Sequence, residues 1–163
     1  MMSSGQEIER RFLVDDPPAD LGASTTIEQL YIAIDEQSEA QTSVRIRRRD
    51  DAYTMTVKGG AGLVRTEVEI DLGAADYAHL STLAGGRRID KRRHLLPLDA
   101  ELTAEVDVFT GRCEGIVIVE VEFPDERSAH RFTPPEWFGV EVTGTAGWSN
   151  AELAVNGPPT SAG

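Results

Sequence analysis

Charged and apolar residues alternate with a period of two along much of the chain, and this pattern limits the possible folds more than any other feature. Because successive side chains of a β-strand point to opposite faces, each alternating segment is predicted to be a strand with one charged face. The predicted strands cover 7–14, 42–48, 52–58, 63–72, 102–109, 116–123 and 140–143. Helical spacing and capping signals predict helices at 74–83, 125–132 and 150–155. The chain is therefore predicted to be a mainly β domain of the α+β class, with antiparallel strands and a few peripheral helices.

The charged faces of these predicted strands consist almost wholly of carboxylates and guanidinium groups. Residues two apart share a face, which groups Glu7, Glu9 and Arg11; Arg45, Arg47 and Arg49; Arg65, Glu67, Glu69 and Asp71; Glu105 and Asp107; and Glu120 and Glu122. A sheet with one solvated face is the alternative interpretation, but such a face normally mixes Thr, Ser, Gln, Lys and Glu. The Glu-x-Glu pattern on separate strands favours faces that are enclosed together.

Enclosing so many carboxylates requires cations among them. Two carboxylates two residues apart on a strand lie ~7 Å from each other and repel by about 2 kcal/mol at an effective dielectric constant of about 20. Divalent metals bound by carboxylate oxygens relieve such repulsion, and arginine forks bind phosphate oxygens bidentately. A barrel with the charged faces inside would explain both signs of charge and would suit a polyphosphate ligand.

Composition limits the domain organisation and the partners. The 163 residues suit one domain, predicted at 1–155 with a flexible tail at 156–163. The net charge of −12 argues against nucleic acid as a partner, whereas basic clusters at 45–49 and 87–93 suit a small polyanion. No apolar run approaches the ~20 residues of a membrane helix, and 1–6 contain no signal region, so a cytoplasmic protein without membrane association is expected. The single cysteine, Cys113, excludes an internal disulfide and is interpreted as a small thiol that is buried or half-buried.

An ordered series of segments resembles the CYTH superfamily, also called the triphosphate tunnel metalloenzymes. The first, Glu7-Ile8-Glu9-Arg10-Arg11, is similar to the family's Glu-x-Glu-x-Lys signature. Further similar segments are at 44–47, 56–58, 65–69, 91–93, 105–109, 120–123, 139–143 and 149–150. The resemblance implies a closed eight-stranded antiparallel β-barrel, the triphosphate tunnel, and hydrolysis of a triphosphate with Mg²⁺ or Mn²⁺.

The resemblance also implies roles for individual residues. The expected metal ligands are Glu7, Glu9, Glu67, Glu69, Asp107, Glu120 and Glu122, with Glu120 and Glu122 as the first choice. The expected substrate-binding residues are Arg11, Arg45, Arg47, Lys58, Lys91 and Arg93, and the expected catalytic residues are Glu7, Glu9, Arg11 and Lys91. Arg11 departs from the family by replacing the signature lysine. Tyr31 is interpreted as a packing residue.

The resulting hypothesis is a metal-dependent triphosphatase, a hydrolase whose partner is a small-molecule triphosphate, with inorganic tripolyphosphate as the first candidate. Water would attack a terminal phosphorus in line, and the chain would be a monomer or homodimer. A class IV-type adenylate cyclase is one alternative, although the His-Phe pair of those relatives is missing before Glu7. A non-catalytic polyphosphate-binding module is another, and Arg11 in place of lysine is its best support.

Overall fold

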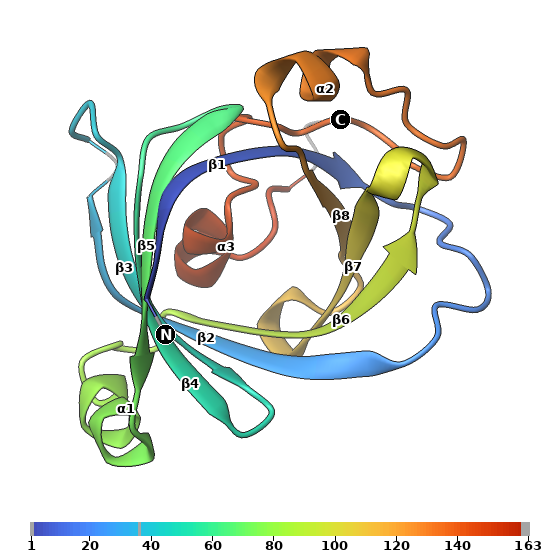
Figure 1. The fold of residues 1–163 in the computed structure, drawn as a ribbon. Helices are drawn as coiled ribbons and strands as arrows, with labels where there is room; N and C mark the ends of the chain where they lie inside the picture. The colour runs from blue at the N-terminus through green and yellow to red at the C-terminus, as the bar shows by residue number, and fades with distance from the viewer. Residues whose placement is uncertain (1, 36, 161–163) are drawn as a thin grey trace.

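A closed antiparallel barrel forms the body of the computed structural model, which describes residues 2–35 and 37–160 (Figure 1). Its eight strands are β1 (Met2–Leu13), β2 (Ser24–Asp35), β3 (Thr42–Arg49), β4 (Ala52–Gly59), β5 (Val64–Leu72), β6 (Arg88–Pro97), β7 (Thr103–Thr110) and β8 (Val117–Glu122). Around the barrel they follow the order β1-β5-β4-β3-β2-β6-β7-β8. The barrel predicted from the family resemblance is thereby confirmed.

Strand β1 closes the barrel by pairing with a different neighbour along each half of its length. Its first half pairs with β5, with Glu7 opposite Arg65, and its second half pairs with β8, with Glu9 opposite Glu122. Closing a sheet in this way leaves no open edge between the first and last strands. The charged face of β1 consequently lies between the charged faces of β5 and β8.

Six of the predicted strands are present, five of them with ends shifted by about one residue, whereas β1 begins at Met2 instead of at residue 7; β2 and β6 were not predicted. A bulge between Tyr31 and Ala33 interrupts the alternation of β2, and β6 carries charged residues on both faces, so neither shows a clean period of two. The strand predicted at 140–143 is wrong. The backbone of that segment donates hydrogen bonds to β1 and accepts hydrogen bonds from it. It forms only a single β-bridge, between Glu141 and Phe12, and turns away at Gly144, so it is not a strand of the barrel.

The helices lie on both sides of the barrel wall. Helices α1 (Ala74–Ser81) and α2 (Glu126–Arg131) lie outside it, whereas α3 (Asn150–Asn156) lies within the ring of strands in Figure 1. Two helical turns, η1 (Asp99–Glu101) and η2 (Gly111–Cys113), precede and follow β7. Helix α3 begins with a capping box, since the Ser149 hydroxyl accepts from the amide of Glu152 at 3.1 Å and the Glu152 carboxylate accepts from the amide of Ser149 at 3.1 Å. None of the described helices is long and apolar enough to cross a membrane.

Helix α3 fills one part of the barrel interior with apolar side chains. Leu153 and Ala154 pack against inward-facing residues of the wall, including Tyr31, Phe109 and Ile118. The predicted buried thiol, Cys113, belongs to the same cluster and is confirmed as buried. The division of the chain at residue 155 stays a prediction, and 161–163 of the predicted tail lie outside the described residues. The remaining interior is lined by the charged faces of the strands.

We expect Gly139→Ala to lower the free energy of unfolding by about 2 kcal/mol or more, because the added methyl group would overlap the backbone of β1. A Cβ at Gly139 would lie 2.5 Å from the carbonyl oxygen of Leu13, which is held in the wall of the barrel. Gly5→Ala is the matched control, because a Cβ at that position of β1 meets nothing within 4 Å. Chemical denaturation of both variants checks the difference; equal stability would show that the 138–142 segment moves freely away from β1.

Candidate active site

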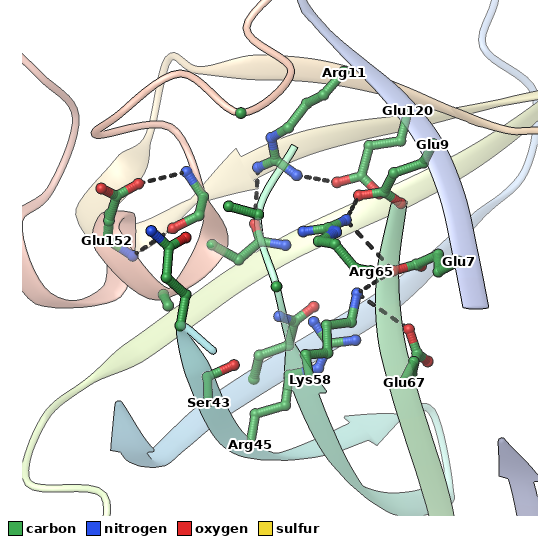
Figure 2. A pocket seen from close by; sticks show the side chains of 18 of the residues that line it. Glu7, Glu9, Arg11, Ser43, Arg45, Lys58, Arg65, Glu67, Glu120 and Glu152 are labelled. Atoms are coloured by element: carbon green, nitrogen blue, oxygen red, sulfur yellow. Dashed lines mark hydrogen bonds and ion pairs between the residues drawn. The ribbon is translucent and has the colours of Figure 1, made fainter. Parts of the chain in front are cut away.

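A cavity of about 520 Å³ occupies the barrel interior beside α3, and its wall is formed by the charged faces predicted from the alternation. All eight strands contribute residues to this wall, although β6 contributes only Arg93 and β7 only Glu105. Figure 2 shows side chains from separate strands pointing into this space. Of the predicted site residues, the cavity is lined by Glu7, Glu9, Arg11, Arg45, Arg47, Lys58, Glu67, Glu69, Arg93, Glu120 and Glu122.

One side of the cavity is an acidic wall made by β1 and β8, defined by Glu7, Glu9, Glu120 and Glu122. The register sets Glu9 directly opposite Glu122, an arrangement that repels unless cations lie nearby. Arg11 supplies one such cation, since its Nη1 atom donates to the Glu120 carboxylate. Arg11 and Glu120 are both buried, so their attraction is only weakly screened by solvent.

Basic side chains from β4 and β5 reach across to the rest of the acidic wall. The Lys58 Nζ atom lies 2.9 Å from a carboxylate oxygen of Glu7 and 3.3 Å from one of Glu67. Arg65 donates to the carboxylates of both Glu7 and Glu9 (Figure 2). Arg65 shares its predicted face with Glu67, but no role was predicted for Arg65. The shared face was the signal that could have identified it as a site residue.

The pKa values of the acidic-wall carboxylates depend on whether basic side chains lie close to them. Burial opposes ionisation of Glu120 and Glu7, but Arg11 and Arg93 lower the pKa of Glu120 strongly, and Lys58 and Arg65 lower that of Glu7. Glu122 behaves differently, because burial and then the nearby carboxylates of Glu7 and Glu67 raise its pKa. The end of the wall at Glu122 therefore has an excess of negative charge.

This excess suits a divalent cation, since carboxylate oxygens are the ligands that hard cations prefer. Among residues 2–35 and 37–160, however, no three acidic, histidine or cysteine side chains already converge as a set of ligands. The carboxylates are instead engaged by Lys58, Arg65 and Arg11. The carboxylate oxygens fit a divalent metal, but to bind one the carboxylates would have to exchange their basic partners for the metal.

The opposite side of the cavity is a basic wall centred on Arg45 and Arg47 of β3. Arg47 donates to Glu69 at 3.0 Å, whereas Arg45 is only 7% exposed and forms no ion pair with any carboxylate of the described residues. Burial works to lower the pKa of Arg45, but the nearby side chains of Tyr31 and Glu67 raise that pKa overall. Burial and then Arg45 itself lower the pKa of Arg47. This wall therefore has an excess of positive charge.

Several guanidinium groups in the cavity also have donors without an acceptor. The buried Nε atoms of Arg11, Arg45, Arg47 and Arg65 make no hydrogen bond within the described chain. A buried donor that stays unpaired costs roughly 1–3 kcal/mol. An anionic ligand with several oxygens would satisfy these donors.

Two predicted site residues, Lys91 and Asp107, lie behind the cavity wall instead of lining it. Their side chains are fully buried, and the Lys91 Nζ atom lies 2.6 Å from the Asp107 carboxylate. Arg93 donates to both oxygens of the same carboxylate, at 2.7 and 2.8 Å. Burial lowers the pKa of Lys91 to about 8 even though Asp107 opposes this shift. In this arrangement Asp107 holds two cations and has no oxygen directed into the cavity.

Residues after the last strand complete the cavity, and the sequence analysis assigned no role to them. The Arg11 Nη2 atom donates to the Asn150 Oδ1 atom at 3.2 Å, and the backbone amide of Arg11 donates to the Thr143 hydroxyl at 2.9 Å. Arg11 thereby connects Glu120 to the segment that leads into α3. Glu105, whose face the alternation had identified, also lines the cavity and lies 2.7 Å from Arg93.

Comparisons with known proteins agree with this geometry. A family model described as the CYTH domain matches residues 5–133. An inorganic triphosphatase of Nitrosomonas europaea is 36% identical over 152 residues, which cover 93% of this chain and 99% of the relative. One of Acetivibrio thermocellus is 37% identical over 156 residues, covering 93% and 95%. A crystal structure of an inorganic triphosphatase has a TM-score of 0.68 at 33% identity and covers 94% of this chain and 97% of its own.

Proposed function

This chain belongs to the CYTH domain family, and on that premise we propose that it is a divalent-metal-dependent triphosphatase that hydrolyses inorganic tripolyphosphate. The observation that carries the proposal is the position of Arg45, a buried guanidinium without an ion pair in the described chain, across the cavity from the acidic wall. A buried charge is costly unless it is paired, so this position suits an anion that arrives as a ligand. Relatives named inorganic triphosphatase support the choice of anion.

In the proposed complex, the basic wall binds the phosphate chain. Arg45 and Arg47 offer planar forks with unpaired Nε donors, a geometry that matches phosphate oxygens. Lys58 and Arg65 would turn from their carboxylate partners toward the phosphates. These preorganised cations would stabilise the negative charge that develops during phosphoryl transfer.

The acidic wall would hold the metal. Glu120 and Glu122 are the proposed ligands, with Glu7 beside them, because all three line the cavity and negative charge is in excess at Glu122. A bound Mg²⁺ or Mn²⁺ would neutralise phosphate oxygens and lower the barrier to attack by water. Glu9 would orient the attacking water toward the terminal phosphorus. Arg11 would keep Glu120 ionised and fixed, and Arg93 would balance the opposed carboxylates of Glu105 and Glu120.

Removal of the metal should abolish turnover. We expect phosphate release from tripolyphosphate with Mg²⁺ or Mn²⁺, loss of release with excess EDTA, and recovery when the metal is restored. A colorimetric phosphate assay with tripolyphosphate, thiamine triphosphate, ATP and GTP measures both activity and preference. Formation of cyclic AMP and pyrophosphate from ATP would indicate a cyclase instead, and tripolyphosphate binding without release under either metal would indicate a binding module.

A further inference from the structure

The second half of β1 lies beside β8 on one side, and on its other side the 139–143 segment takes the place of a neighbouring strand. The backbone amide of Leu13 donates to the carbonyl oxygen of Val140 at 2.9 Å, as it would in a sheet. The amide of Arg11 donates instead to the hydroxyl group of Thr143, also at 2.9 Å. At Arg11 the barrel wall is therefore held by a side chain, in a place where a sheet would supply a backbone carbonyl.

The direction of the Thr143 hydroxyl group is set by Glu141. The Thr143 Oγ1 atom donates its one proton to the Oε1 atom of Glu141 at 2.9 Å. Because the proton is engaged there, the lone pairs of the hydroxyl oxygen remain free to accept from the Arg11 amide. A hydroxyl without this acceptor would rotate, and the Arg11 amide would lose a fixed partner.

Glu141 is in turn held by Arg10 on the outer face of β1. Arg10 donates to both carboxylate oxygens of Glu141, each at 2.8 Å, in the bidentate geometry that fixes a carboxylate in one orientation. Its Nη1 atom also donates to the carbonyl oxygens of Ala129 and Phe132, at 3.0 and 2.9 Å, near the end of α2. The hydrogen bonds from Arg10 lower the pKa of Glu141 against the effect of burial, and the one from Thr143 adds to them. Glu141 is therefore an ionised acceptor in a fixed position.

Arg10 and Arg11 are consecutive residues, so their side chains point to opposite faces of β1. On the inner face, the Arg11 guanidinium donates to the Glu120 carboxylate and, at 3.2 Å, to Asn150. The backbone of Arg11 thus carries the group that holds one carboxylate of the acidic wall in place. A displacement of this backbone would draw the guanidinium away from Glu120.

We propose that Glu141 is a positioning residue, which acts on the cavity from the outer face of the barrel. It directs the Thr143 hydroxyl toward the Arg11 amide, and Arg11 thereby stays where its guanidinium pairs with Glu120. Glu141 does not line the cavity, and its side chain is 38% exposed, so its influence reaches the cavity through these contacts. This inference rests on the proposed function, because it takes Glu120 as a metal ligand.

Amide hydrogen exchange, measured by NMR on the protein without metal, tests the structural part of the proposal. Glu141→Gln keeps the shape of the side chain but leaves one acceptor oxygen for both Arg10 and Thr143. Thr143→Val removes the hydroxyl and keeps the volume. We expect the Arg11 amide to exchange about tenfold faster in both variants, as for the loss of one hydrogen bond. The Leu13 amide keeps its backbone acceptor and should exchange as in the wild type, as should the Arg11 amide of Thr143→Ser, which retains the hydroxyl.

Metal activation tests the link to the cavity. We expect the Mg²⁺ concentration for half-maximal phosphate release to rise about tenfold in Glu141→Gln, since residues behind a metal ligand tune its affinity. The KM for tripolyphosphate at saturating Mg²⁺ should stay unchanged, because the basic wall on β3 is not altered. A loss of folded protein would lower the rate alone and would leave both constants in place.

Asp90→Asn is the matched control, because it also changes a carboxylate that holds an arginine fork on the outer face of the barrel. Asp90 of β6 accepts from Arg88 at 2.8 and 3.0 Å and does not line the cavity. Its Mg²⁺ requirement and its KM should equal those of the wild type.

Arg11 exchange at the wild-type rate in Glu141→Gln and Thr143→Val would overturn the proposal. Equal acceleration of Arg11 and Leu13 would overturn it as well, because Glu141 would then only anchor the 139–143 segment to β1. Faster exchange of Arg11 with an unchanged Mg²⁺ requirement would overturn the link to the metal. A wild type without metal-dependent phosphate release would overturn the proposed function, and hydrogen exchange would still decide whether Glu141 positions Arg11. Either variant is sufficient for the exchange test if the other does not fold.

Discussion

Glu120→Gln should lose metal-dependent phosphate release from tripolyphosphate by roughly a thousandfold or more while remaining folded. The substitution removes the carboxylate charge proposed to bind the metal but keeps an oxygen that can accept from Arg11. Loss of the ion pair with Arg11 lowers stability, and relief of repulsion with Glu105, which lies directly opposite, offsets part of this loss. Initial rates at saturating Mg²⁺ and a thermal unfolding curve measure the two effects separately.

The matched control for this variant is Glu114→Gln, which makes the same chemical change at an exposed position beside η2, outside the cavity. Its rate and unfolding temperature should equal those of the wild type. Full activity of Glu120→Gln would remove Glu120 from the mechanism. A loss of activity that accompanies general unfolding would instead show that the pair with Arg11 is structural.

Arg45→Met should raise the KM for tripolyphosphate by about a hundredfold without lowering the free energy of unfolding. Arg45 forms no ion pair in the described part of the chain, so only Tyr31 and more distant carboxylates offset the desolvation of this buried charge in the protein without ligand. Methionine fills much of the same volume without that cost, and Tyr31 keeps its hydrogen bond from Gln29. Substrate binding should therefore weaken, while the free energy of unfolding should stay level or rise.

Arg48→Met provides the comparison on the same strand, since Arg48 is exposed on the outer face of the barrel. We expect neither its KM nor its unfolding temperature to differ from the wild type by a large amount. The role assigned to Arg45 is contradicted if Arg45→Met is strongly destabilised and keeps the wild-type KM. That outcome would identify Arg45 as a structural cation.

The sequence predicted which residues share a face, but not how deep each residue lies within the barrel. Alternation placed Asp107 on an inward face correctly, because side-chain direction follows from the period of a strand, whereas Lys91 and Arg93 of β6 were predicted only from the family resemblance. Whether an inward residue reaches the cavity depends on what fills the barrel at its level. Lys91 lies against the ring of Phe109, at 5.5 Å from its centroid, in the part of the interior that α3 fills.

The alternating charged faces favoured a barrel that encloses them, but its eight strands were predicted only from the family resemblance. Alternation reveals neither β2, with its bulge after Tyr31, nor β6, which lacks an apolar face. The contribution of Asn150 could not be predicted from periodicity either, because it lies at the start of a helix and reaches Arg11 only through the tertiary fold. Residues on regular strands were thus predictable, and those supplied by the C-terminal segment were not.

The active site is complete only when β1 has closed the barrel, because β1 carries part of the acidic wall to its partner residues on β8. Arg11 and Glu120 are 109 residues apart in the sequence, and they meet only when the N-terminal strand docks against β8. Contacts of such long range form slowly, because the intervening chain must be ordered first. A chain in which β1 has not docked against β8 therefore lacks the pair of Arg11 and Glu120, even where Arg47 already donates to Glu69 of β5. Ribosomal synthesis must deliver β8 before any triphosphate can be captured productively.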